Sequence, residues 1–155
     1  MDKLILFLID GKNDISSNDQ ILAEKIKRIG AVTLLSDNKS IPYWNRNIKQ
    51  NNLIEFYEGV NKDGDLCNFI NILSIIKNVG KSSIDILTGD GGFDFSIDFN
   101  KQEELAFRLI LSQVAYAIGL QRYGGTFILK VFDTFMKPSI DILYILAAFY
   151  KNVHI

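Results

Sequence analysis

The sequence predicts an α/β fold, in which helices cover both faces of a mostly parallel sheet. Short apolar runs alternate with longer stretches whose apolar residues have helical spacing, which is the pattern of parallel strands joined by crossover helices. The chain has 155 residues, of which 48% are hydrophobic and 23% are charged, enough for one domain with a core but few for two. No repeat or interdomain linker interrupts the pattern, so we expect a single domain over residues 1–155.

The first part of the chain is expected to form three strands and one helix. The apolar residues 4–9 predict a strand, because this run ends at an aspartate and is too short for the core of a signal peptide. Helical spacing of apolar residues predicts a helix over residues 18–29, which Gly30 ends. Further strands are expected at residues 31–35 and 53–57.

The second part continues the alternation. Helices are expected at residues 66–78, 101–123 and 139–150, and strands at residues 84–88 and 126–132. The helix at 101–123 carries apolar residues on more than one face, as expected for a helix between a sheet and another layer. A last strand is expected to begin at Val153.

Composition excludes several classes of protein. The net charge is only -1, so a nucleic acid would have to be bound by a local basic patch. The single cysteine, Cys67, excludes an internal disulfide, and the only histidine, His154, lies too near the end of the chain to suggest a Cys-His pair. The longest apolar stretch, residues 142–150, is shorter than the roughly 18 residues of a membrane span. We therefore expect a soluble intracellular protein that makes no contact with a membrane.

Residues 61–65, NKDGD, are similar to the start of a calcium loop. The sixth and twelfth positions of that loop would be Leu66 and Ile72, where glycine and glutamate are required. We expect no metal site. The glycines around Asp90 lack the spacing of nucleotide-binding loops and are expected instead to let the backbone turn sharply and approach a ligand closely.

Two predicted strands carry a charged residue to their carboxyl ends. The segment TGDGGFD places Asp90 after the strand at 84–88, and GGTFILKVFD places Lys130 in the strand at 126–132. In open parallel sheets ligands bind at this edge. Taken singly, each residue has a simpler interpretation, because Asp90 could cap a helix and Lys130 could be a solvated strand end.

The order and spacing of TGDGGFD, NKQEEL (residues 100–105) and GGTFILKVFD resemble the FtsJ-like ribose 2′-O-methyltransferases of RNA. The resemblance is to their mRNA cap branch, found in eukaryotes and large DNA viruses, and it extends from about Ala31 to the end of the chain. It implies a Rossmann-like methyltransferase fold that uses S-adenosylmethionine. The implied reaction is methylation of the ribose 2′-hydroxyl of a cap-proximal nucleotide, with capped RNA as the partner.

The active site of this family is a Lys-Asp-Lys-Glu tetrad. By the resemblance, Asp90 is the catalytic aspartate and Lys130 is the second lysine. The positions that match the RNA contacts of the family are Asn100, Lys101 and Gln102. The positions that match its cofactor contacts are Asp10, Gly11, Asn13, Asp65, Leu66 and Asp90. Two further basic residues near the predicted site, Arg108 and Lys137, are candidates for phosphate contacts or simply part of a solvated helix face.

The chain also departs from the family pattern. The GPGGF-like cofactor turn of the family aligns with residues 9–15, IDGKNDI, where only Gly11 is kept. The first tetrad lysine would precede Met1, the glutamate would follow Ile155, and the last antiparallel strand of the family has no counterpart. The chain therefore looks like a partial FtsJ-like domain that is incomplete at its C-terminal strands. A partner chain or flanking sequence is expected to complete it.

These departures leave two functions open. A lysine that removes a proton must be neutral, and a second positive charge favours the neutral form whereas a carboxylate opposes it. With two tetrad members missing, we expect little methyl transfer from these residues alone. The first interpretation is a cap ribose methyltransferase completed by further sequence, in the host cytoplasm if the chain is viral and with the nucleus as a further candidate if it is cellular. The second is a degenerate FtsJ-like domain that binds RNA or protein.

Overall fold

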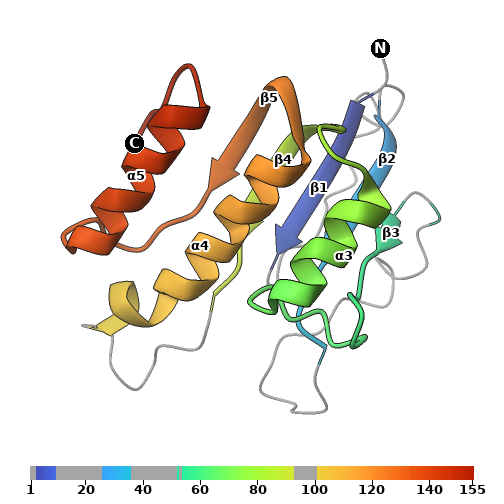
Figure 1. Cartoon of the computed structure of the whole chain (residues 1–155), viewed down its shortest axis with the longest axis horizontal. Helices are drawn as coiled ribbons and strands as arrows, with labels where there is room; N and C mark the ends of the chain where they lie inside the picture. The colour runs from blue at the N-terminus through green and yellow to red at the C-terminus, as the bar shows by residue number, and fades with distance from the viewer. Residues whose placement is uncertain (1–2, 10–25, 36–51, 53, 93–100) are drawn as a thin grey trace.

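The computed structural model describes residues 3–9, 26–35, 52, 54–92 and 101–155 (Figure 1). Five strands form one sheet in the order β3-β2-β1-β4-β5. They are β1 (Lys3–Ile9), β2 (Ile26–Val32), β3 (Ile54–Phe56), β4 (Ile84–Asp90) and β5 (Gln121–Leu129). Every neighbouring pair in this sheet is parallel. The expected α/β fold of the Rossmann-like kind is confirmed.

The strand order reverses beside β1. The chain runs outward from β1 to β3 and then returns to place β4 on the other side of β1. The register pairs Ile9 with Asp90 and Gly89 with Leu129, so the carboxyl ends of β1, β4 and β5 reach the same edge of the sheet. In open α/β sheets this edge, at the reversal of strand order, is where ligands bind.

Three described helices, α3 (Phe69–Val79), α4 (Gln102–Leu120) and α5 (Lys137–Phe149), lie side by side with α4 in the middle (Figure 1). All three were expected from the sequence, with ends that differ by one to three residues. The helix α3 begins after Asn68, whose side chain accepts a hydrogen bond from the backbone N–H of Ile70, and it ends at Gly80, which has a positive φ of 104°. None of the described helices is long and apolar enough to cross a bilayer.

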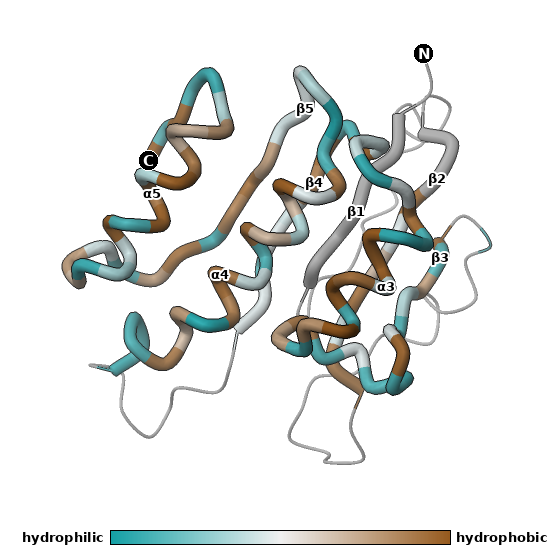
Figure 2. The backbone as a smooth tube through the Cα atoms, viewed as in Figure 1, coloured by the Kyte–Doolittle hydropathy of each residue, from teal (hydrophilic) through white to brown (hydrophobic). Residues whose placement is uncertain are grey.

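The helix α4 has buried residues on two of its sides. One side packs against α3 and β4 through a core cluster that includes Ile75, Leu87 and Tyr116. Its other side forms a second cluster with α5 and β5, which includes Val114 and Leu146. Hydropathy alternates along all three helices (Figure 2), as expected where one face meets a core. The prediction that this helix is apolar on more than one face is therefore confirmed, but its neighbours are the sheet and the two flanking helices α3 and α5, and not a further layer.

The expected helix over residues 18–29 is wrong at its carboxyl end. Residues 26–29 belong to β2, and residues 18–25 lie outside the described residues. Gly30 does not end a helix but lies inside the strand, paired with Leu6 on one side and Glu55 on the other. Pairing with two neighbouring strands outweighs the local helical spacing of these residues. The strand expected at residues 31–35 is correspondingly displaced, and the one expected at 53–57 is confirmed as β3.

The boundary between α4 and β5 also differs from the prediction. The helix was expected to run to Tyr123, but β5 begins at Gln121. Ile84 pairs with Gln121 whereas Ile86 pairs with Thr126, so residues 122–125 form a bulge in the ladder. The bulge absorbs the extra residues and brings the remainder of β5 into register with β4.

The strand that was expected to begin at Val153 is not formed. Residues 152–155 have no regular secondary structure. Within the described part of the chain, β5 is the last strand of the sheet and pairs only with β4.

Candidate active site

The side chains of Asp90 and Lys130 meet at the carboxyl edge of the sheet. Lys130 Nζ lies 2.9 Å from Asp90 Oδ1, and the side chains are 60% and 28% exposed, respectively. Asp90 is the last residue of β4, and Lys130 directly follows β5. The backbone N–H of Lys130 donates to the carbonyl oxygen of Gly89 at 2.8 Å, which fixes the chain at that point. The structure therefore brings together the two residues expected to be catalytic.

The face of β4 that carries Asp90 also carries Thr88, because side chains two residues apart point to the same side of a strand. The Thr88 hydroxyl is buried and has no hydrogen-bond partner among the described residues. It was not singled out from the sequence, where a threonine in a β-branched strand looks purely structural. It adds a polar group to the side of the sheet on which Asp90 lies.

The segment expected to contact RNA lies at the start of α4. Gln102 is the first residue of the helix and Lys101 is its N-cap position, while Asn100 lies outside the described residues. The next residue, Glu103, is buried, and its carboxylate accepts hydrogen bonds from the backbone N–H groups of Met136 at 2.8 Å and Phe135 at 3.3 Å. Glu103 thereby ties the start of α4 to the segment that follows Lys130.

Two opposing effects act on the pKa of the Glu103 carboxyl. Desolvation by burial raises it, but hydrogen bonds from the Ser139 side chain and from the two backbone N–H groups together hold the pKa below its usual value. Sequence reasoning missed this residue. The available signal was an acidic residue in the first turn of a helix, where it also interacts favourably with the helix dipole.

The loop between β3 and α3 is held by one buried amide. Asn71 Oδ1 accepts from the N–H of Val60 at 2.9 Å, and its Nδ2 donates to Asp63 Oδ1 at 2.7 Å and to the Asp65 carbonyl oxygen at 3.1 Å. Hydrogen bonds, chiefly from the Asp65 N–H and also from Asn71, keep the pKa of Asp63 below its usual value against the opposing effect of desolvation. The NKDGD segment is thus organised as a hydrogen-bonded turn.

This turn packs against the end of β2. The N–H of Leu35 donates to the Asp63 carbonyl oxygen at 2.6 Å. Gly64 has a positive φ of 64°, and a Cβ at this position would lie 1.7 Å from the Thr33 carbonyl oxygen. Only glycine therefore permits this contact.

The two residues expected to contact the adenosyl group differ in accessibility. Asp65 is partly exposed, and its Oδ1 accepts from the N–H of Cys67 at 2.8 Å. Leu66 is only 7% exposed, with its side chain in the core, so it presents little more than its backbone to a ligand. The remaining expected cofactor contacts, Asp10, Gly11 and Asn13, lie outside the described residues.

The family described as FtsJ-like methyltransferase matches residues 17–155 of this chain. The chain belongs to this family. Individual relatives are also similar to it, and three of them share the name cap-specific mRNA (nucleoside-2′-O-)-methyltransferase 1. The one from Trypanosoma cruzi is 36% identical over 98 residues, which cover 63% of this chain and 27% of the relative. The human one is 33% identical over 99 residues, covering 61% and 12%, and the one from Caenorhabditis elegans is 30% identical over 103 residues, covering 64% and 11%.

This FtsJ-like methyltransferase chain thus spans only a minor part of the relatives it matches, at most 27% of the length of those three. Members of the family transfer methyl groups, and S-adenosylmethionine is the methyl donor that the family implies.

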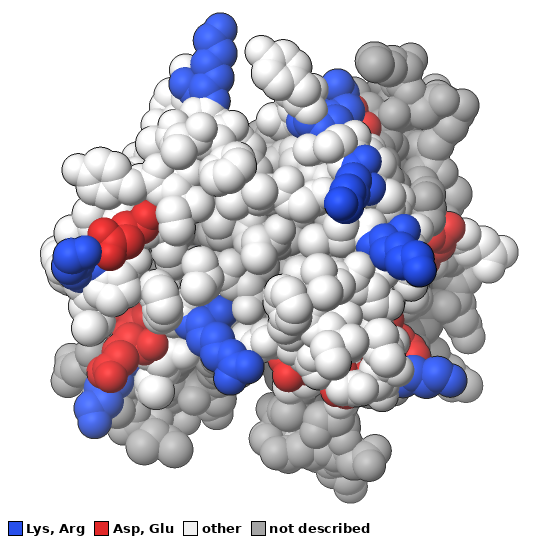
Figure 3. Space-filling model, viewed as in Figure 1, with Lys and Arg blue, Asp and Glu red and all other residues white. Residues whose placement is uncertain are grey.

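On the face shown in Figure 3, the basic residues that the structure describes are dispersed over the helices. Arg108 donates to the carbonyl oxygen of Cys67 at 3.3 Å, and Lys137 forms an ion pair with Asp141 at 2.8 Å within its own helix. Cys67 itself is half-buried, and desolvation raises the pKa of its thiol. Both basic residues thus have local protein partners.

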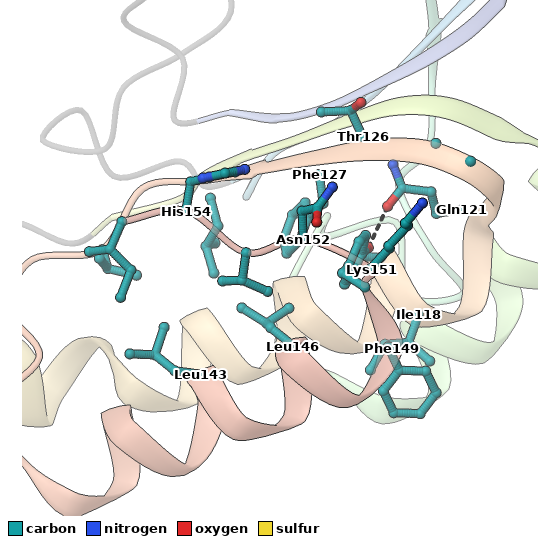
Figure 4. A pocket seen from close by; sticks show the side chains of 18 of the residues that line it. Ile118, Gln121, Thr126, Phe127, Leu143, Leu146, Phe149, Lys151, Asn152 and His154 are labelled. Carbon is teal, nitrogen blue, oxygen red and sulfur yellow. Dashed lines mark hydrogen bonds between the residues drawn. The ribbon is translucent and has the colours of Figure 1, made fainter.

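A groove of about 1170 Å³ lies beside the outer edge of β5. Figure 4 shows Thr126, Phe127, Asn152 and His154 along one side, with Leu143, Leu146 and Phe149 of α5 opposite. Tyr150, after α5, donates its hydroxyl hydrogen to Gln121 Oε1 at one end of the groove. Lys130 contributes to the wall of the groove, but Asp90 does not. The groove thus adjoins the edge where the two expected catalytic residues meet, on the side of Lys130.

Proposed function

We propose that this chain carries catalytic residues of an S-adenosylmethionine-dependent methyltransferase that acts on the ribose 2′-hydroxyl of a cap-proximal mRNA nucleotide. The observation that carries the proposal is the contact of Asp90 and Lys130, 2.9 Å apart at the ligand-binding edge of the sheet. Membership of the FtsJ-like family supports methyl transfer. The names of the relatives support capped mRNA as the substrate.

The chemistry requires a hydroxyl oxygen to be held in line with a methyl group. When bound, S-adenosylmethionine would offer a methyl carbon that the ribose oxygen could attack, with the sulfur as the leaving group and solvent water as the acceptor of the hydroxyl proton. S-adenosylmethionine supplies the methyl group on a positively charged sulfur. Lys130 donates a hydrogen bond to the ribose oxygen and positions it. Asp90 orients the Lys130 side chain through the ion pair.

Two of the proposed cofactor residues, Asp65 and Leu66, lie between the carboxyl end of β3 and the start of α3. Asp65 offers a partly exposed carboxylate and Leu66 a backbone amide, which suit the hydroxyl and base groups of an adenosyl ligand. Asp10, Gly11 and Asn13 follow β1, the strand beside Asp90, and are proposed to complete the cofactor contacts. Asn100, Lys101 and Gln102 are proposed to contact the RNA.

The experiment measures transfer of a radiolabelled methyl group from S-adenosylmethionine to short capped RNAs. It uses this chain and the longest protein that its reading frame encodes. One RNA has ordinary riboses, and its matched partners have a 2′-deoxyribose at the first or second nucleotide. The label is expected only where the 2′-hydroxyl is present, and Lys130→Met is expected to lower the rate of labelling by at least about 100-fold.

A matched control replaces Lys77, an exposed lysine in the last turn of α3, by methionine. This variant is expected to retain methyl transfer. Transfer that is unaffected by the loss of the 2′-hydroxyl, or by Lys130→Met, would contradict the proposal. Binding of capped RNA without any methyl transfer by the longest protein would favour a degenerate binding module instead.

A further inference from the structure

Asp90 lies between two glycines that both contact the same buried amide of α4. The N–H of Gly91 donates to Gln113 Oε1 at 3.0 Å. A Cβ on Gly89 would lie 2.8 Å from this oxygen, and one on Gly91 would lie 3.2 Å from it. Neither glycine is among the described residues with positive φ, so they are required here for space. The two glycines therefore let the backbone approach a protein side chain closely, and the expected close approach to a ligand stays a prediction.

The Gln113 side chain is held at both ends of its amide. Its Oε1 accepts from Gly91, and its Nε2 donates to the carbonyl oxygen of Leu109 at 3.2 Å. The residue is 0% exposed. Burying an amide in a core is costly unless its hydrogen bonds are made, so an apolar residue would suit a purely structural position better. The amide therefore has a specific use at this point of the fold.

Gly89 links this amide to both expected catalytic residues. On one side its backbone continues into Asp90, and its carbonyl oxygen accepts from the N–H of Lys130 at 2.8 Å. Because successive residues of a strand face opposite sides of the sheet, Gly89 and Gly91 face α4 while Asp90 faces away from it. Contact with Gln113 thus fixes the backbone on both sides of Asp90 without touching the carboxylate.

We propose that Gln113 is a positioning residue, which holds the end of β4 so that the Asp90 carboxylate stays beside the Lys130 ammonium. The catalytic consequence rests on the function proposed above, whereas the effect on the geometry of the ion pair does not. Gln113 acts through the backbone and does not touch the reacting atoms.

The first test is independent of activity. Nuclear magnetic resonance measures the hydrogen-bond coupling between Lys130 Nζ and the Asp90 carboxylate carbon, together with hydrogen exchange of the Gly91 amide. Gln113→Met keeps the size of the side chain but removes the acceptor. It is expected to abolish the coupling and to accelerate exchange at Gly91 by at least about tenfold relative to the amides of α3, because one net hydrogen bond is lost.

Two further variants make this test specific. Gln113→Glu keeps an acceptor oxygen and, when protonated, matches the amide in shape, so it is expected to recover the coupling as the pH is lowered. Leu120→Ala truncates a buried residue at the far end of α4 and lowers stability without contact with Gly91. This control is expected to retain the coupling. An intact coupling in Gln113→Met, or an equal loss in Leu120→Ala, would overturn the proposal.

The second test uses methyl transfer to capped RNA. Gln113→Met is expected to lower kcat by on the order of 100-fold, as a misplacement of about 1 Å does, with little change in KM for RNA. An unchanged kcat in this variant would overturn the proposal while leaving the proposed function intact. If no methyl transfer is found in the unmodified protein, the proposed function fails, and the resonance measurements still decide whether Gln113 positions Asp90.

Discussion

Two ion pairs join β4 to β5, one at each end of the strands. At the amino end, Arg122 Nε donates to Asp85 Oδ1 at 2.6 Å, and the side chains are 35% and 7% exposed, respectively. At the carboxyl end, Lys130 and Asp90 meet at 2.9 Å with side chains that are 60% and 28% exposed. The pairs have the same charges and connect the same strands, but they differ in burial and in the type of cation.

We infer from the differences in burial and in the cation that the Arg122–Asp85 pair is structural, whereas the Lys130–Asp90 pair is accessible to a substrate. Arginine stays charged and offers a rigid planar donor group, and Arg122 reaches from the bulge to a buried carboxylate, which holds the irregular start of β5 against β4. Lysine has a compact and flexible ammonium group, and the Lys130 pair lies at the edge where ligands bind. An ion pair in a parallel sheet therefore indicates a functional site only if it lies at the carboxyl ends of the strands, where ligands bind.

If the proposed function holds, the largest expected effect comes from replacing Lys130 by methionine. The rate of methyl transfer should fall by about 10² to 10⁴-fold, the range typical of a residue that handles the proton or its oxygen. The urea midpoint should change little, because exposed ion pairs contribute only about 0 to 1 kcal/mol. A variant that loses its fold together with its activity would weaken the distinction between the two pairs.

The second prediction concerns Asp85→Ala. This change leaves the Arg122 guanidinium without its buried partner. It should lower the free energy of unfolding by about 2 to 3 kcal/mol. The loss is at or below the lower end of the range for fully buried pairs, because the Arg122 side chain is 35% exposed. Urea unfolding measures it. The double variant Asp85→Leu with Arg122→Met should recover part of the loss, since apolar replacement of both partners is often tolerated. A double variant less stable than Asp85→Ala would argue against this account.

The third prediction is the matching change at the other end, Asp90→Asn. It should cost less than about 1 kcal/mol of unfolding free energy, because the Lys130 ammonium that it leaves is 60% exposed and can be solvated. Equal losses of stability in Asp85→Ala and Asp90→Asn, measured in the same urea series, would remove the contrast between the two ends.

The smallest expected effect is the loss of the stability contributed by Glu103 when the pH is lowered. Because the pKa of Glu103 is lower in the folded protein than its ordinary value, this carboxylate contributes stability above the unfolded pKa of about 4.3, and that contribution is lost as the pH falls through the folded pKa. Urea midpoints of the unmodified protein and of Glu103→Gln should therefore converge on acidification from pH 7. A difference that persists unchanged in acid would contradict this linkage.

The sequence predicted the strands β1, β3 and β4 and the pairing of Asp90 with Lys130, because short apolar runs and a specific family motif are local signals. It misplaced β2, since residues 26–29 satisfy a helical spacing equally well and only their two strand neighbours decide the outcome. The bulge at residues 122–125 depends on a long-range contact between Arg122 and Asp85. Gln113 had the weakest signal in the sequence, because it is one amide beside Ser112 in a mostly apolar stretch of helix.

The helix α4 carries two of the contacts that hold this edge, and this constrains how the chain can change in length. Gln113, which binds the end of β4, lies ten positions after Glu103, which binds the segment after Lys130. In a helix this separation fixes a distance of about 15 Å and a set angle between the two side chains, and one inserted residue would rotate one against the other by about 100°. Insertions and deletions should therefore be excluded between these two positions, even where single substitutions on the outer surface of the helix are tolerated.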